Sequence, residues 1–171
     1  DVSVDAIKKS EIILLEGYLW DEGDPKNAFD KAIANSKNVA MSLSDQFCVD
    51  RHKPHFLDLV KNQLDIVFAN EQEILSLIDG KNFTDAISFS KEVKKNIIIT
   101  RGAKGAVAIN KSEIVEIEGK SNLNIKDLTG AGDLFAAGYL HGIINNLKTK
   151  ECLERGTELS SKIIQIIGAR I

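Results

Sequence analysis

Short apolar runs alternate along this chain with longer stretches in which apolar residues recur at helical spacing. Continuous apolar runs are typical of buried parallel strands, and they occur at residues 12–15, 39–43, 65–69 and 96–100. The intervening segments predict helices at residues 25–37, from Pro54 to residue 64, at 71–78, and from a cap at Thr84 to Val93. Strands that alternate with helices predict a mostly parallel α/β sheet with helices on both faces.

The pattern changes in the last third of the chain. Residues 106–109 and 114–117 read as two strands joined by a hairpin-like turn, and long helices are predicted over residues 130–147 and 151–167. No repeat or linker interrupts the chain, so residues 1–171 are predicted to form a single α/β domain. Because the chain starts with Asp1 and its start reads as a helix end or a loop, we expect it to be part of a longer protein.

Composition narrows the class of protein. Hydrophobic residues make up 43% of the 171 residues, enough for a packed core, and the net charge of −3 argues against a nucleic-acid surface. No apolar run approaches the ~18 residues of a membrane span, and no secretory signal is present. Cys48 and Cys152 are too few and too far apart for a disulfide scaffold or zinc site, so a cytoplasmic protein is expected.

The string Asp127-Leu-Thr-Gly-Ala-Gly-Asp133 opens the predicted helix over residues 130–147 and carries the most chemistry. Gly130 and Gly132 expose backbone N–H groups where a helix N-terminus already favours an anion such as phosphate. Asp133 beside such a pocket suggests removal of a proton from a group that attacks the phosphate. Alternatively, the roles are purely structural: Asp133 complements the helix dipole, and the glycines form a turn.

The whole string resembles the second signature of the ribokinase-like (pfkB) carbohydrate kinase family, Asp-x-Thr-Gly-Ala-Gly-Asp. The resemblance implies a three-layer α/β/α ribokinase-like fold, of which this chain would be the C-terminal part, without the N-terminal part and its β-sheet lid. It implies that Thr129, Gly130, Ala131 and Gly132 hold the transferring phosphoryl group, with the 130–132 backbone as anion hole. Asp133 would be the catalytic base.

Asn70-Glu-Gln-Glu73 follows a predicted strand, where an open α/β sheet places its ligands. It resembles the family's Asn-x-x-Glu motif, which organises Mg²⁺ and phosphate. The resemblance implies that Asn70 helps bind the nucleotide's phosphates and that Glu73 holds Mg²⁺ through water. Alternatively, Glu71 and Glu73 only favour a helix N-terminus.

Thr100-Arg-Gly-Ala-Lys-Gly105 resembles the family's Thr-x-Gly-x-x-Gly segment, which implies that Thr100, Gly102 and Gly105 line the nucleotide site. A plain turn between strands is the alternative, and Arg101 could reach a phosphate or be a solvated charge. The segment Ser161-Lys-Ile-Ile-Gln-Ile-Ile-Gly-Ala-Arg170 resembles the family's last helix and the loop beside the adenine. Its apolar residues are read as core, and only the region near Gly168 is expected to approach the nucleotide.

In many members of the family, the Asp that matches Asp127 helps bind a monovalent cation, usually potassium, next to the anion hole, and the resemblance implies the same role for Asp127. A loop carboxylate that caps nearby amides is an equal alternative for Asp127.

The segments Glu16-Gly-Tyr-Leu-Trp-Asp21 and 42–52 resemble the bacterial adenosine-kinase-like subgroup. The resemblance therefore implies an ATP- and Mg²⁺-dependent kinase, with K⁺ as a candidate cofactor, acting on a hydroxymethyl group of an adenosine-like nucleoside or a sugar. A homodimer is a candidate assembly for the complete protein. The competing hypothesis is a truncated, non-catalytic nucleotide-binding module.

Overall fold

The computed structural model describes residues 2–20 and 26–170. The chain divides into two compact units. The first unit comprises Asp1–Ile99 and Ile109–Glu113, and the second comprises Thr100–Ala108 and Ile114–Ile171. Single-domain organisation over residues 1–171 stays a prediction. Asp21 and Pro25, which belong to segments discussed above, lie outside the described residues.

The first unit is built on parallel strands with helices between them. Its strands are β1 (Ile13–Glu16), β2 (Val39–Ser42), β3 (Ile66–Asn70) and β4 (Asn96–Thr100), the last of which ends at the start of the second unit. Leu15, Met41 and Val67 lie side by side across β1, β2 and β3, and all are buried. Short strands that are buried in this way explain why their sequences are apolar without alternation.

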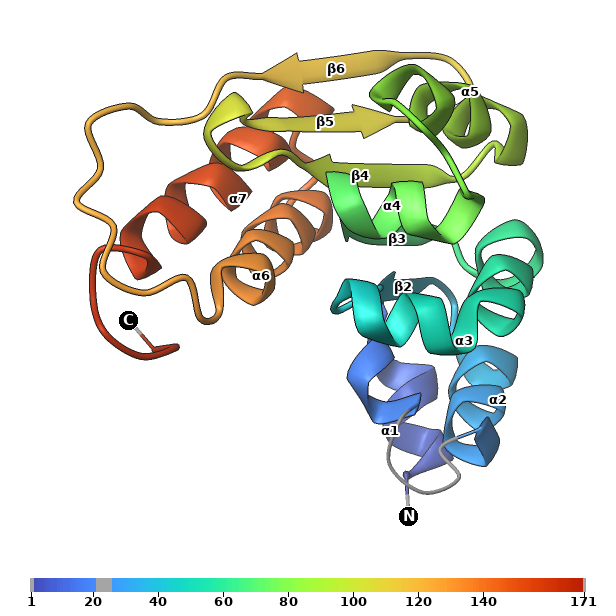
Figure 1. The fold of residues 1–171 in the computed structure, drawn as a ribbon. Helices are drawn as coiled ribbons and strands as arrows, with labels where there is room; N and C mark the ends of the chain where they lie inside the picture. Colours follow the sequence, from blue (N-terminus) through green and yellow to red (C-terminus); the bar gives the residue numbers. More distant parts are fainter. Residues whose placement is uncertain (1, 21–25, 171) are drawn as a thin grey trace. The chain divides into compact units, whose positions relative to one another are not determined.

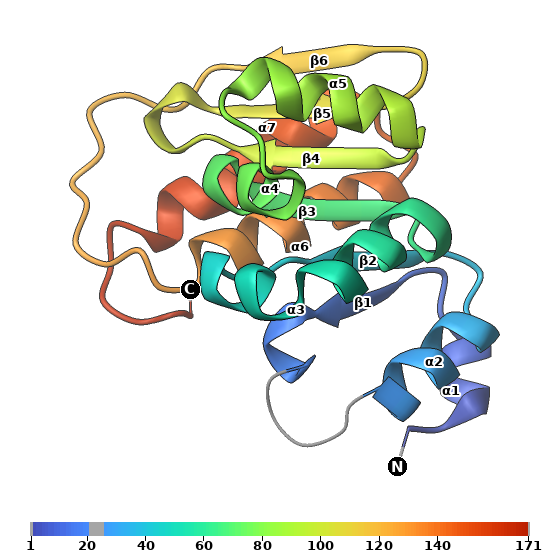
Figure 2. The same cartoon turned by 45° about the vertical axis from the view of Figure 1, so that its right-hand side comes forward.

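The α-helices of the first unit are α1 (Val4–Lys9), α2 (Lys26–Asn35), α3 (Gln46–Asp58), α4 (Glu71–Ile78) and α5 (Phe83–Val93). It also has a short 3-10 helix, η1 (Gly17–Trp20), and a short π-helix, η2 (Leu59–Gln63). Helix α3 packs against α4, and α4 packs against α5. Helices α3 and α4 lie along one face of these strands (Figure 2). The strands run β1-β2-β3-β4-β5-β6 in one mostly parallel sheet with flanking helices, which confirms the predicted fold class.

The second unit holds η3 (Gly102–Lys104), β5 (Ala106–Ile109), β6 (Ile114–Ile117), α6 (Ala131–Ile144) and α7 (Thr149–Ile163). Strands β5 and β6 run in opposite directions, as the predicted hairpin requires, and α6 and α7 lie side by side (Figure 1). A side chain at Gly138 would come within 2.8 Å of the Arg155 carbonyl oxygen, and one at Gly156 would come as close to that of Phe135. Glycine therefore lets the two helix backbones approach closely.

Two predicted helix starts were wrong. Helix α3 begins at Gln46, because the Asp45 side chain accepts the Cys48 N–H and caps it, and Pro54 lies inside the helix rather than at its start. A proline has no N–H for the helical ladder, and the backbone is non-helical at His52, where the helix kinks. Helix α5 is capped by Asn82 rather than Thr84, since the Asn82 side chain accepts the Thr84 and Asp85 amides.

Two predicted helix ends were too late. Asn146 adopts a left-handed conformation and Leu147 N–H donates to the Gly142 carbonyl, which closes α6 after Ile144. Helix α7 ends at Ile163, and the next carbonyl, that of Ile164, accepts the Lys126 N–H at 2.8 Å. Within residues 2–20 and 26–170, no helix is both long enough and apolar enough to cross a bilayer.

Candidate active site

The turn that starts α6 leaves backbone donors open. Gly130 caps the helix in a left-handed conformation (φ 78°), and no side chain caps it. Ala131 N–H donates to the Leu128 carbonyl, whereas the N–H groups of Gly132 and Asp133 have no acceptor among the described residues. A Cβ built on Gly132 meets nothing within 4 Å. Open donors, open space and the positive end of a 14-residue helix together suit an anion.

The Asp127 side chain hydrogen-bonds to the backbone of this turn and of a segment distant in sequence. Its Oδ1 accepts the Thr129 N–H and its Oδ2 accepts the Gly168 N–H, both at 2.9 Å. Hydrogen bonds from the Thr129 side chain, the Thr129 amide and the Gly168 amide lower the pKa of Asp127 to about 2. The amide-capping alternative for Asp127 is therefore present in the structure. A carboxylate has about four acceptor sites, and these three hydrogen bonds leave one of them open, so a role toward a cation is compatible with the capping and stays a prediction.

The segment after β4 needs its glycines. Gly105 has φ 93° and ψ −138°, a backbone region that is essentially restricted to glycine, and an added Cβ would lie 2.0 Å from the Ile117 carbonyl oxygen. Gly102 also has a positive φ (57°), but a Cβ there would meet open space. Arg101 forms an ion pair with Glu116 at 3.0 Å, so its guanidinium is engaged within the second unit.

One cavity of about 440 Å³ in the second unit joins these two segments. Its lining includes Thr100, Gly102 and Gly105 from the predicted nucleotide motif and Ala131 and Gly132 from the predicted anion hole. Its volume falls within the range of small-molecule and cofactor sites. Thr129, Gly130, Asp133 and Gly168 are not among the lining residues. Thr129, Gly130 and Asp133 lie within two residues of Ala131 or Gly132 in the chain, and the Gly168 N–H donates to Asp127.

Asn70 and Glu73 bind each other in the first unit. Asn70 caps α4, its N–H donates to Glu73 Oε2 at 2.8 Å, and its Nδ2 donates to Oε1 at 2.5 Å. Glu73 is 5% exposed, and burial raises its pKa to about 7, against the opposing hydrogen bonds from Asn70 and with a further rise from the Asp45 charge. The helix-terminus alternative is thus present as a capping box. A contact of Glu73 with Mg²⁺ through water stays a prediction.

Sequence reasoning missed part of the cavity wall. It expected only the region near Gly168 to approach the nucleotide, whereas Thr157, Ser160, Ser161 and Ile164 of the α7 region line the cavity. The available signal was the spacing of Thr157 and Ser161, small polar residues one turn apart on the buried face of an amphipathic helix.

Comparison with known proteins identifies the family of this chain. The sequence pattern of the pfkB family carbohydrate kinases matches residues 1–171. The chain belongs to this family. Among curated pfkB relatives, an adenosine kinase from Schizophyllum commune is 28% identical over 185 aligned residues, covering 96% of this chain and 53% of that protein.

Solved structures agree with the family and the fold. The adenosine kinase from Sinorhizobium meliloti superposes with a TM-score of 0.95 at 36% identity, over 100% of this chain and 54% of that one. A ribokinase from Thermotoga maritima has the same fold, with a TM-score of 0.77 at 20% identity over 98% and 55% of the two chains. This pfkB chain therefore spans about half the length of the curated relatives it matches.

Proposed function

We propose that this chain is the nucleotide-binding and catalytic part of a kinase that transfers the γ-phosphoryl group of ATP to a hydroxymethyl oxygen. The observation that carries the proposal is the first turn of α6, whose free amides at Gly132 and Asp133 lie beside a cavity shared with the Thr100, Gly102 and Gly105 segment. Membership of the pfkB family supports the same reaction class.

The proposed roles follow from the negative charge on the phosphoryl group during its transfer. Phosphoryl transfer passes through a loose transition state, so positioning and charge stabilisation dominate catalysis. The 130–132 backbone would stabilise the phosphoryl oxygens, with Thr129 beside it, because donors fixed before the reaction need no reorganisation during it. Asp133 is exposed at the same turn and would accept the proton of the acceptor hydroxyl.

The residues present fit the expected ions. Asn70 and Glu73 offer an amide and a carboxylate that are already hydrogen-bonded, which suits Mg²⁺ held through water rather than directly. The low pKa of Asp127 keeps its carboxylate anionic, so its oxygens can ligate K⁺. The cation would supply countercharge to the phosphates.

Adenosine-like nucleosides are the favoured acceptors. Two relatives described above are adenosine kinases, one of them 36% identical. A sugar acceptor is the second candidate within the same chemistry. A cytoplasmic location and a homodimer of the complete protein remain predictions. The competing function is a nucleotide-binding module without turnover.

Titration calorimetry with ATP and Mg²⁺ tests the proposal. Gly132→Asp should weaken binding at least about tenfold, because a charged side chain would enter the open space where the anion is expected. The matched control is Ala137→Asp, which adds the same charge to an exposed position of α6 outside the cavity lining. Equal ATP affinity of the Gly132→Asp protein and the wild type would place the nucleotide elsewhere and refute the proposed site.

A further inference from the structure

An ion pair in the second unit joins the turn after β4 to strand β6. The Arg101 Nη1 atom lies 3.0 Å from Glu116 Oε1, and the exposed fraction of the side chain is 15% for Arg101 and 55% for Glu116. Arg101 directly follows β4, and Glu116 lies within β6. Strand β5 lies between β4 and β6 in the sheet, so the ion pair spans an intervening strand.

The turn at residues 100–105 is otherwise closed by hydrogen bonds of its own backbone. Arg101 N–H donates to the Gly105 carbonyl at 2.8 Å, and Gly105 N–H donates to the Gly102 carbonyl at 3.0 Å. These bonds join residues within the turn and do not reach β6. A Cβ built on Gly102 would meet nothing within 4 Å among the described residues, so that side of the turn is unpacked. The Arg101 side chain adds a link to β6 that the backbone bonds lack.

The segment that follows β6 shares the cavity wall with this turn. A Cβ built on Gly119 would lie 2.5 Å from the Ala103 carbonyl oxygen, so the two backbones are in close contact. Ala103 and Gly119 both line the cavity, whereas Arg101 and Glu116 do not. The ion pair is therefore placed to fix the spacing of two wall segments without itself forming the wall.

We propose that Arg101 and Glu116 are positioning residues, whose ion pair holds the turn at residues 100–105 in the conformation that binds the nucleotide. This inference rests on the proposed function, because it presumes that the nucleotide occupies the cavity. The apparent affinity for a ligand falls with the fraction of protein in the binding-competent conformation, so a turn that is fixed beforehand binds more tightly. Arginine suits this role because its planar guanidinium is always charged and holds a carboxylate in a defined geometry.

The alternative is that Arg101 leaves Glu116 and binds a phosphate of the nucleotide directly. The two roles predict opposite effects of a change at Glu116. If the ion pair positions the turn, Glu116→Gln loosens the turn and lowers the affinity for ATP. If Arg101 binds phosphate, Glu116→Gln removes a competing partner and raises that affinity.

Titration calorimetry of the 171-residue chain with Mg²⁺ and ATP distinguishes these roles. Arg101→Gln and Glu116→Gln should each weaken ATP binding about 3- to 5-fold, an effect of the size expected for a partly exposed ion pair. The double variant should bind no more weakly than either single variant, because all three lose the same contact. Arg101→Lys keeps the charge and should retain most of the affinity. Thermal unfolding shows whether each variant is folded at the temperature of the titration.

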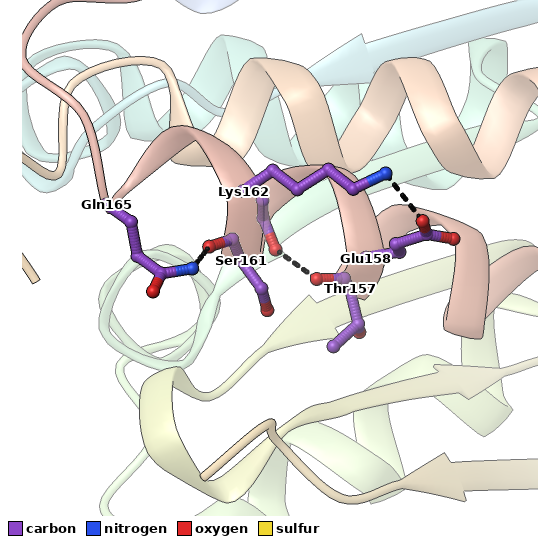
Figure 3. A network of polar contacts seen from close by, with 6 residues as sticks. Thr157, Glu158, Ser161, Lys162 and Gln165 are labelled. Carbon is purple, nitrogen blue, oxygen red and sulfur yellow. Dashed lines mark hydrogen bonds and ion pairs between the residues drawn. The ribbon is translucent and has the colours of Figure 1, made fainter. Parts of the chain in front are cut away.

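Lys162→Gln is the matched control. Lys162 pairs with Glu158 at 2.6 Å, and both residues belong to α7 and lie outside the cavity lining (Figure 3). This variant also removes one ion pair from the second unit, but that pair does not join two segments of the wall. Its affinity for ATP should equal that of the wild type.

Three results would overturn the inference. If the wild type binds ATP and Glu116→Gln binds it as tightly or more tightly, the positioning role is wrong while the proposed function stands. If the losses of the two single variants add in the double variant, Arg101 and Glu116 act separately. If the wild type does not bind ATP, the proposed function fails and this inference fails with it.

Discussion

The carboxylate of Asp127 holds the amide of Gly168, 41 residues further along the chain, at 2.9 Å. Its other oxygen holds the amide of Thr129 at the same distance. One side chain thus joins the loop before α6 to the segment after α7. The Gly132 and Asp133 amides follow directly on this loop, so the proposed anion hole depends on a contact that is distant in sequence.

This contact predicts an acid-sensitive stability. The pKa of Asp127 in the folded state is about 2, below its ordinary value of 3.8, so ionised Asp127 favours the folded state above pH ~4. That contribution should disappear as the pH falls through about 2. Chemical denaturation of the wild type and Asp127→Asn should therefore give a gap in unfolding free energy that is constant from pH 5 to 8 and narrows below pH 4. A gap independent of pH would contradict the assignment.

The same residue predicts a cation effect. If Asp127 holds a monovalent cation, K⁺ should raise the activity of a version extended to the length of its relatives more than Li⁺ does. Asp127→Ala should abolish that difference. Steady-state rates at constant ionic strength measure this. Equal rates in K⁺ and Li⁺ for the wild type would contradict a cation role for Asp127. Its role would then be limited to its hydrogen bonds with Thr129 and Gly168.

Two glycines of α6 should respond oppositely to the same change. Gly132→Ala places a methyl group in open space and should stabilise the fold by roughly 0.5–1 kcal/mol, because alanine is the better helix former. Gly138→Ala forces a methyl group to within 2.8 Å of the Arg155 carbonyl oxygen and should cost about 1–3 kcal/mol. Denaturant unfolding of both variants measures the two effects. Similar shifts in both would contradict the described α6–α7 packing.

Glu73 predicts a second pH dependence, of opposite sign. Its pKa in the folded state is about 7, above its ordinary value of 4.5, because burial disfavours the charged form. The folded state then binds the proton more tightly, so stability should fall by about 3 kcal/mol as the pH rises from 4.5 to 7 and stay level above that. Glu73→Gln should lack this decline. Unfolding free energies measured across this range in the presence of a chelator test it, and parallel curves would contradict the shift.

Much of the fold could be predicted because burial leaves a direct mark on the sequence. The strands around Leu15, Met41 and Val67 are continuous apolar runs since they are buried within a parallel sheet. The glycines before Asp133 marked the start of α6, which the structure places at Ala131. These signals are local and need no knowledge of the partners.

The errors arose where a contact with a residue distant in sequence, or a competing local contact, determines where a helix begins or ends. A proline usually starts a helix, but Pro54 sits inside α3 because the Asp45 cap and the kink at His52 accommodate it. The end of α7 coincides with a carbonyl that bonds to Lys126. The place of Thr157 and Ser161 in the cavity wall was missed for the same reason, since only the folded structure shows which residues line the cavity.

In the proposed reaction, Asp133 accepts the proton of the acceptor hydroxyl. The direct measurement is ADP production from ATP and a panel of nucleosides and sugars by the version extended to the length of its relatives, with Asp133 and with Asp133→Asn. Asn is nearly the same size but cannot take the proton, so kcat should fall ~10²–10⁴-fold while ATP affinity changes little or improves. Full turnover by the Asp133→Asn enzyme would contradict the account.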